Sequence, residues 1–278
     1  MLRFSDTYSP QMLRRGDVFA ARQYPRRAFD NLSDPVLNID WFDMRGPTFP
    51  AHPHAGFSAV TYVFADSPNG FANRDSLSGE AVTIAPGALH WSRASGGIIH
   101  EETPIAGRGS ARGLQIFINL PADRQLDPAA AFHVDANDVV TASGEGWHSR
   151  VAVNGVAIGA EPNALPAPVR IEEVQLQPNA HWSSDVPAAW GGIIIVLDGD
   201  VTLTNGPALH TSAAVAFATS HGAQLSLTAG EYGARVAIVS GAQLDQPVHS
   251  QGPFMLASPE ALAERIAAYQ AGDFGTIG

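Results

Sequence analysis

Short runs in which apolar and polar residues alternate recur along the whole chain, separated by clusters of glycine, proline, asparagine and aspartate. A period of two is typical of strands that bury one face. Strands separated by turns at intervals of about ten residues are typical of sandwiches and barrels. The pattern therefore predicts an all-β protein. The predicted strands are residues 36–44, 58–65, 80–85, 97–102, 113–121, 150–159, 169–177, 191–205, 212–219, 223–230 and 234–241.

One segment near the C-terminus has the pattern of a helix instead. Ser258 is a suitable N-cap, Pro259 fits the first helical position and Gly272 can end the helix. The apolar stripe of this segment consists of Leu262, Ile266 and Tyr269. A single stripe predicts a short C-terminal helix that packs against a barrel.

The chain also divides into two similar halves. Residues 121–147 differ in composition from their surroundings and fit a linker or crossover. Residues 47–64 and 177–200 each run from a proline-containing turn through histidine into an apolar strand. We therefore expect an N-terminal barrel in residues 1–130 and a C-terminal barrel, with the helix, in residues 131–278.

The composition limits the chemistry that the chain can carry. Its formal net charge of −11 disfavours direct contact with a nucleic-acid backbone. All sixteen basic residues are arginine, so lysine Schiff bases and P-loop lysines are excluded. The absence of cysteine excludes disulfides and thiolate metal sites. A metal ion would have to be held by histidine, aspartate, glutamate or backbone groups.

The N-terminal segment bears on location. The first 29 residues contain six arginines but no continuous apolar stretch, so they do not have the pattern of a secretory signal. An arginine-rich start can mimic an organelle transit peptide, but a structured or loosely packed arm is the interpretation that we favour. No segment approaches the roughly 18 apolar residues of a membrane span. We expect a soluble, cytoplasmic protein that does not contact a membrane.

Two short motifs carry the candidate chemistry. The sequence FPAHPHAGF places His52 and His54 on one face of a predicted strand, about 6.6 Å apart along the chain. The sequence GGIIHEE places His100 and Glu102 on one face of another strand, with Glu101 facing away. If the two strands are neighbours, three imidazoles and one carboxylate converge on one point.

Donors of this kind suit a first-row divalent metal and leave open coordination positions, which catalysis requires. Fe(II) with dioxygen is the natural chemistry for such a set, and nickel, copper or zinc can occupy the same site. His90 follows a Pro-Gly turn and is predicted in a loop. One alternative is that it is exposed or structural. The other is that it supports the metal ligands from behind or contacts the substrate. The other histidines are isolated and are expected at the surface or in structural roles: His133, His148, His181, His210, His221 and His249.

Five stretches, in chain order, resemble the pirin family of bicupins: HPHAGFSAVTYVF, NRDSLSG, IAPGALHWSRASGGIIHEETP, GLQIFINLP and QGPFMLASPEALAERIAAYQAGDFG. The resemblance implies two cupin-type β-barrels, with a mononuclear Fe(II) in the N-terminal barrel only. The residues that match the family's metal ligands are His52, His54, His100 and Glu102. The C-terminal barrel of such proteins typically lacks metal ligands, which fits the single His181.

The resemblance also implies a function. Some pirin-like proteins are associated with quercetin 2,3-dioxygenase activity and others with transcriptional co-regulation. We expect a dioxygenase that opens the ring of a flavonol-like substrate with O2, with Glu102 accepting a proton from a substrate hydroxyl. The alternatives are an iron-dependent, redox-responsive regulatory protein that acts through a protein partner, and a metal site that only stabilises the barrel. The chain departs from the family at Ala55 and Ser58, where Arg and Glu are common, and at His90, where Gln is usual. The resemblance implies that all three lie close to the metal site, so it does not fix the polarity of the pocket or the choice of substrate.

Overall fold

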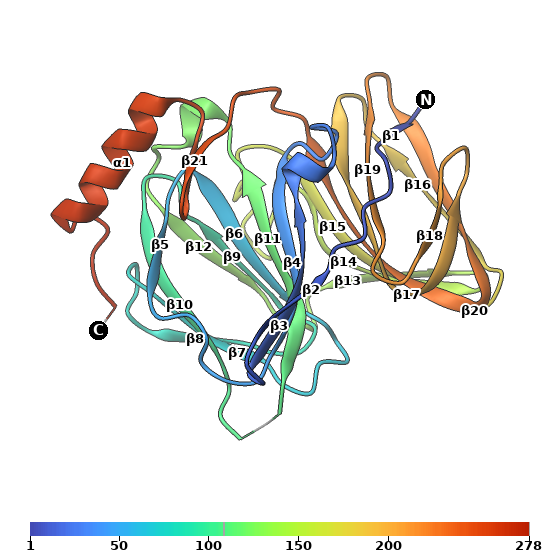
Figure 1. Ribbon diagram of the computed structural model, residues 1–278, viewed down its shortest axis with the longest axis horizontal. Coiled ribbons are helices and arrows are strands. Elements are labelled where there is room, and N and C mark those ends of the chain that lie inside the picture. The colour runs from blue at the N-terminus through green and yellow to red at the C-terminus, as the bar shows by residue number, and fades with distance from the viewer. Residues whose placement is uncertain (108, 278) are drawn as a thin grey trace. The chain divides into compact units, whose positions relative to one another are not determined.

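A computed structural model describes residues 1–107 and 109–277 (Figure 1). The described residues form strands, two short 3-10 helices and one α-helix, which confirms the all-β class with a C-terminal helix. The strands are β1 (Arg3–Phe4), β2 (Met12–Arg15), β3 (Phe19–Pro25), β4 (Val36–Met44), β5 (His52–His54), β6 (Phe57–Val63), β7 (Phe71–Asp75), β8 (Ala81–Ile84), β9 (Leu89–Arg93), β10 (Ile98–Pro104), β11 (Ala111–Asn119), β12 (Ala130–Val134), β13 (Val140–Gly144), β14 (Trp147–Gly155), β15 (Val169–Leu176), β16 (His181–Val186), β17 (Trp190–Leu203), β18 (Ala208–His210), β19 (Ala214–Thr219), β20 (Ala223–Ala242), β21 (His249–Gln251) and β22 (Phe254–Leu256). The 3-10 helices are η1 (Arg26–Ala28) and η2 (Ala122–Arg124), and the α-helix is α1 (Pro259–Ala271).

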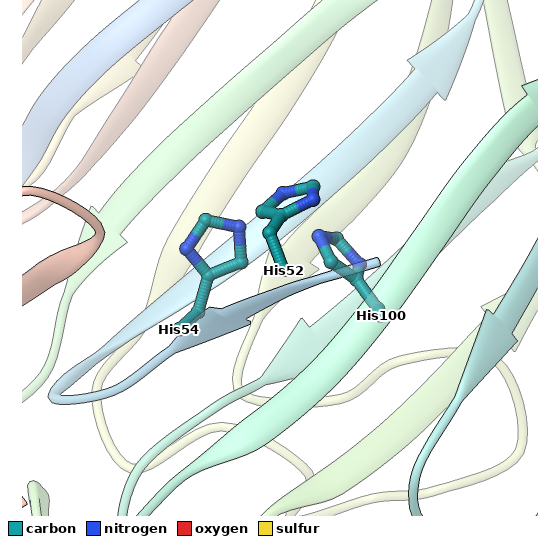
Figure 2. A group of neighbouring side chains, drawn as sticks. All are labelled: His52, His54 and His100. Carbon is teal, nitrogen blue, oxygen red and sulfur yellow. The ribbon is translucent and has the colours of Figure 1, made fainter. Parts of the chain in front are cut away.

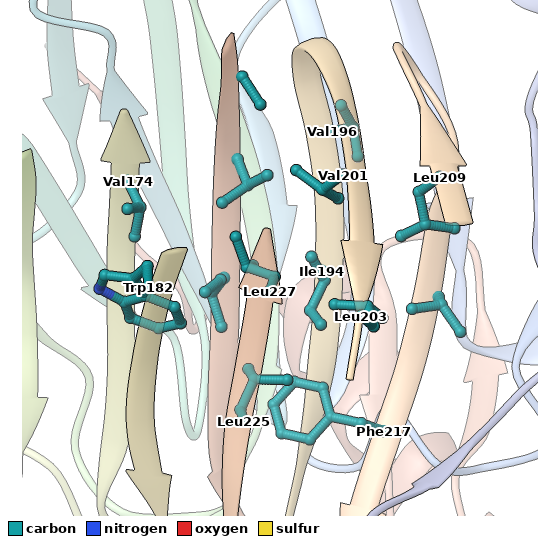
Figure 3. Close-up of a cluster of buried hydrophobic side chains, with 14 of the residues drawn as sticks. Val174, Trp182, Ile194, Val196, Val201, Leu203, Leu209, Phe217, Leu225 and Leu227 are labelled. Carbon is teal, nitrogen blue, oxygen red and sulfur yellow. The ribbon is translucent and has the colours of Figure 1, made fainter. Parts of the chain in front are cut away.

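The largest sheet has the strand order β1-β19-β17-β20-β15-β14-β13, with β16 paired to β20 and β18 paired to β17. Its strands bury one hydrophobic core that includes Trp182, Ile194, Phe217 and Leu227 (Figure 3). β20 spans two runs that the sequence predicted as separate strands. They join because the antiparallel ladder between β17 and β20 continues through two register shifts instead of ending.

Two further sheets share a second core. Their strand orders are β12-β9-β6-β11-β4-β3-β2 and β5-β10-β7-β8. Phe42 on β4 and Phe71 on β7 meet edge to face between these sheets, with ring centroids 5.2 Å apart. The surrounding cluster also buries Val63 and Ile84. This core supports the strands that carry the candidate metal ligands.

The C-terminal helix begins and ends where the sequence predicted. The Ser258 hydroxyl accepts a hydrogen bond from the backbone N–H of Ala261 at 3.1 Å, and Gly272 ends the helix with a left-handed φ of 87°. The helix lies beside the β21–β22 hairpin, where Ala268 is buried with Phe254 (Figure 1). Among the described residues, no helix has the length and apolarity needed to cross a membrane.

The two compact units of the chain are not continuous in sequence. One contains Met1–Gln11, Gln23–Asn38 and Val139–Gln243. The other contains Met12–Arg22, Ile39–Asp138 and Leu244–Gly278. The change of unit at residue 138 falls within the expected crossover, although that segment also forms η2, β12 and β13.

These units differ in their bounds from the expected division into residues 1–130 and 131–278, which stays an expectation. The chain's first residues belong with the later strands because β1 pairs with β19 through Phe4 and Phe217. The C-terminal helix belongs with the earlier strands because Ala268 and Phe274 pack in one cluster with Ala55. The apolar face of the helix thus covers the unit that carries the candidate site.

Candidate metal centre

The two histidine motifs lie on neighbouring strands. β5 pairs with β10 in antiparallel register, so that His100 lies opposite His52 and Ile98 lies opposite His54. Residues opposite each other in such a ladder share a face, as do residues i and i+2 of one strand. The predicted adjacency of the two motifs is therefore confirmed, and it explains why three imidazoles meet.

His52, His54 and His100, called here the histidine triad, form a nearly equilateral group. Each pair of ring centroids is 4.8 Å apart, and one nitrogen of each ring lies within 4.8 Å of the others. Figure 2 shows the three rings facing a common space from two strands. A single ion in that space would lie within reach of all three nitrogens.

Hydrogen bonding and burial leave these imidazoles in the form that binds metals. Nδ1 of His52 lies 2.9 Å from the carbonyl oxygen of Pro50. Because a carbonyl only accepts, Nδ1 is the donor in this contact, and the tautomer that this favours has its lone pair on Nε2. The other two rings are almost fully buried, with 4% of His54 and 2% of His100 exposed.

Burial lowers the pKa of His54 to about 3, and repulsion from His52 adds to the effect, while the Pro253 carbonyl opposes it. Burial also lowers the pKa of His100 well below its usual value, with repulsion from His54 and His52. Both imidazoles are therefore neutral near pH 7. Nδ1 of His100 is buried without a hydrogen-bond partner in the described part of the chain. The triad fits a divalent cation, which would compensate buried polar nitrogens.

Glu102 lies on the wall of the same cavity but outside the group of three converging nitrogens. Its carboxylate is hydrogen-bonded to the Thr61 hydroxyl, which also lies 2.9 Å from Oε1 of Gln115. Burial raises the pKa of Glu102 to about 7, and the hydrogen bond from Thr61 opposes that rise. The side chain can hold or release a proton near neutrality. Its role as a metal ligand stays a prediction.

The triad and Glu102 line a cavity of about 150 Å³. In other proteins a cavity of about this size accommodates one benzene ring. The remaining lining side chains are Phe19, Asp40, Phe42, Met44, Phe49, Phe71, Gln115 and Phe117. Apolar walls with a few convergent polar groups are typical of small-molecule sites. The cavity is suited to one aromatic ring placed against the triad.

His90 does not lie in a loop, as the sequence predicted, but in β9, where only 3% of it is exposed. The strand extends further than the Pro-Gly turn indicated because it pairs with both β6 and β12. Nε2 of His90 lies 3.1 Å from the Asn73 amide nitrogen, and its ring faces His133 at a centroid distance of 5.8 Å. Burial lowers the pKa of His90 to about 4. It does not line the cavity, although it lies opposite Thr61 across the ladder between β6 and β9.

The other departures from the family pattern also lie away from the cavity lining. Ala55 packs in the cluster beneath α1, and Ser58 is fully buried in β6. Neither residue lines the cavity, so neither sets the polarity of the pocket by direct contact with a ligand.

Two polar residues of the site were missed at the sequence level: Gln115, which lines the cavity, and Thr61, which is hydrogen-bonded to Glu102. Thr61 on β6 and Gln115 on β11 are direct partners across the ladder. The available signal was a polar residue at an inward position of an otherwise apolar run, in SAVTYVF and GLQIFIN. Pattern reasoning treated those runs as core and did not single out these positions.

Comparison with known proteins assigns the family. A family model described as pirin matches residues 4–118, and a second model, described as the pirin C-terminal cupin domain, matches residues 171–275. The chain belongs to the pirin family. Its all-β fold is therefore a bicupin, and the triad lies within the first matched segment.

Individual pirin relatives cover most of the chain. A Pseudomonas aeruginosa protein named "Putative quercetin 2,3-dioxygenase" is 28% identical over 250 residues, which are 86% of each chain. Human pirin is 27% identical over 252 residues, which are 88% of this chain and 84% of that protein. These similarities support a pirin-like cupin with a small-molecule site.

Solved structures share the fold. A quercetin 2,3-dioxygenase from Acinetobacter baumannii matches with a TM-score of 0.86 at 24% identity, over 100% of both chains. A bacterial pirin from Escherichia coli, in complex with nickel(II), matches with a TM-score of 0.64 at 16% identity, over 87% of this chain and 99% of that one. Both likenesses concern the fold, and the metal site in this chain is indicated by its own histidine triad.

Proposed function

We propose that this pirin is a mononuclear Fe(II) dioxygenase that opens the ring of flavonol-like aromatic substrates with O2. The observation that carries the proposal is the group of three converging imidazoles that line a cavity with aromatic walls. The name of the Pseudomonas aeruginosa relative supports the same reaction class. Nickel, copper or zinc can replace iron at such a site, because Fe(II) lies low in the affinity order of divalent ions.

In this proposal His52, His54, His100 and Glu102 hold the metal. When bound, the metal would lower the pKa of a coordinated substrate hydroxyl and supply the redox chemistry that O2 requires. The chain's own groups perform the remaining tasks. The phenylalanines of the cavity exclude water and orient the ring, and the Glu102 carboxylate accepts the hydroxyl proton at an oxygen that Thr61 positions.

Oxygen uptake tests the proposal. The protein would be loaded anaerobically with Fe(II), then mixed with O2 in the presence or absence of quercetin, beside a His100→Ala control. We expect uptake that requires both quercetin and His100, with a product that contains the added oxygen by mass spectrometry. Uptake that persists in the His100→Ala variant would contradict the proposed site.

The redox-responsive regulatory protein is the second candidate function. It shares the metal site and differs in having no turnover, and the similarity to human pirin is compatible with it. Iron bound by the triad, with no uptake on any aromatic diol, would favour it over the enzyme. A protein partner and a cytoplasmic location belong to this proposal as expectations.

A further inference from the structure

An exposed arginine on an edge strand stacks on a residue that lines the cavity. β2 is the last strand in its sheet, and all four of its residues are exposed. The guanidinium carbon of Arg15 lies over the Phe49 ring, 4.8 Å from its centroid. Phe49 lines the cavity, and its ring is 6.5 Å from that of His52. One aromatic ring therefore separates the Arg15 guanidinium from the nearest histidine of the triad.

This guanidinium is available to an anion. No ion pair involves Arg15 within the described residues, although the chain has a net charge of −11. The acid in the adjoining β2–β3 turn, Asp17, forms none with it, and Asp43 pairs with Arg45 at 3.8 Å. The stack on Phe49 holds the guanidinium plane while its N–H groups stay free to donate hydrogen bonds.

Charges inside the cavity have the opposite sign. Asp40 lines it, and so does Glu102, which adds a negative charge when its carboxyl group is deprotonated, so a ligand's negative group is disfavoured beside them unless it binds the metal. The cavity holds about one aromatic ring, so the rest of a larger ligand extends out of it. Arg15 is exposed and lies over Phe49, a residue of the cavity wall, so it can meet that part of a ligand. The charges thus distinguish the two ends of a ligand.

We propose that Arg15 selects aromatic substrates that carry an anionic substituent, such as a carboxylate or sulfonate, at the end remote from the histidine triad. This inference rests on the proposed function, because it names the class of substrate for the same cavity. Arg15 acts on binding and orientation. It does not touch the reacting end of the substrate.

Binding without turnover tests the inference. The probes are 3-hydroxyflavone and its 4′-carboxylate, which share a ring system and differ in one charge. Both are titrated by fluorescence into the purified protein under argon, at fixed metal content. We expect the carboxylate to bind the wild-type protein more tightly than the neutral probe, and its advantage to shrink with added salt.

The decisive variants are Arg15→Gln and its matched control Arg14→Gln. Arg14 is the preceding residue of β2, so its side chain points to the other face of the strand. We expect Arg15→Gln to weaken the carboxylate probe about fivefold, which is typical of one partly exposed ion pair, and to leave the neutral probe unchanged. Arg14→Gln should leave both affinities unchanged.

Three results would overturn the inference. They are an equal loss for both probes in the Arg15→Gln variant, an equal effect of Arg14→Gln and Arg15→Gln on the carboxylate, and no preference for the carboxylate in the wild-type protein. Because the titration excludes O2, absence of oxygenase activity would contradict the proposed function and leave this test intact. Conversely, if quercetin is turned over and any of the three results is found, the role of Arg15 is refuted and the proposed function stands.

Discussion

The buried imidazoles make the stability of the metal-free protein depend on pH in a defined direction. Burial lowers the pKa of His54 from 6.5 to about 3 in the folded state. Between pH 3 and pH 6.5 the His54 imidazole is therefore protonated in the unfolded state and neutral in the folded state. The stabilising contribution is fully present above pH 6.5 and is lost as the pH falls toward 3. Between pH 7 and pH 5 the loss for His54 is about 2 kcal/mol.

The assay is urea unfolding of protein dialysed against a chelator, at pH 7, 6 and 5. We compare the wild-type protein with His54→Gln, which removes the titrating group, and with His221→Gln, which changes an exposed histidine. In both proteins the free energy of unfolding should fall between pH 7 and pH 5. We expect this fall to be about 2 kcal/mol smaller in His54→Gln than in the wild-type protein. His221→Gln should keep the wild-type slope. Equal slopes in the wild-type protein and His54→Gln would refute the claim that His54 is buried in its neutral form.

Three further predictions concern the metal, the carboxylate and the backbone. Adding Ni(II) or Zn(II) at about 100 times its Kd should stabilise the folded protein by about 2.7 kcal/mol, measured as a rise in Tm by calorimetry, and His52→Ala should abolish the rise. Glu102→Gln keeps the side-chain shape but cannot accept the substrate proton, so it should lower the rate of oxygen uptake at least about tenfold. Far-ultraviolet circular dichroism should stay unchanged, and an unaltered rate of oxygen uptake would remove Glu102 from the mechanism. Gly56→Ala should lower the free energy of unfolding, measured in urea, by more than about 2 kcal/mol. The reason is that Gly56 has a φ of 88° and that an added Cβ would collide with the Met255 carbonyl. An unchanged free energy of unfolding would show that the backbone at Gly56 does not have this conformation and this close contact.

Much of the candidate site follows from the period of a strand. His52 and His54 are two residues apart, and the GGIIHEE motif has the same spacing, so each motif had to present both of its side chains on one face. The sequence does not encode which strands are neighbours in a β protein, because such pairing depends on contacts distant along the chain. The adjacency of β5 and β10 was therefore a conditional expectation, and the ladder between His52 and His100 confirms it.

Other features depend on tertiary context that local patterns do not record. His90 was expected in a loop because a Pro-Gly turn precedes it, yet pairing on both sides of β9 draws it into a buried strand. The position of α1 is another case. Its caps at Ser258 and Gly272 could be predicted from the sequence. The surface on which it packs includes Ala55, roughly 200 residues earlier in the chain, and no local pattern links that residue to the helix.

The metal content of the purified protein tests the central claim most directly. Iron is offered anaerobically, unbound metal is removed, and the bound metal is measured by mass spectrometry for the wild-type protein, His100→Ala and His90→Ala. We predict one equivalent of metal in the wild-type protein and in His90→Ala, whose side chain does not line the cavity, and none in His100→Ala. One equivalent of metal in His100→Ala would show that β5 and β10 do not form the metal centre.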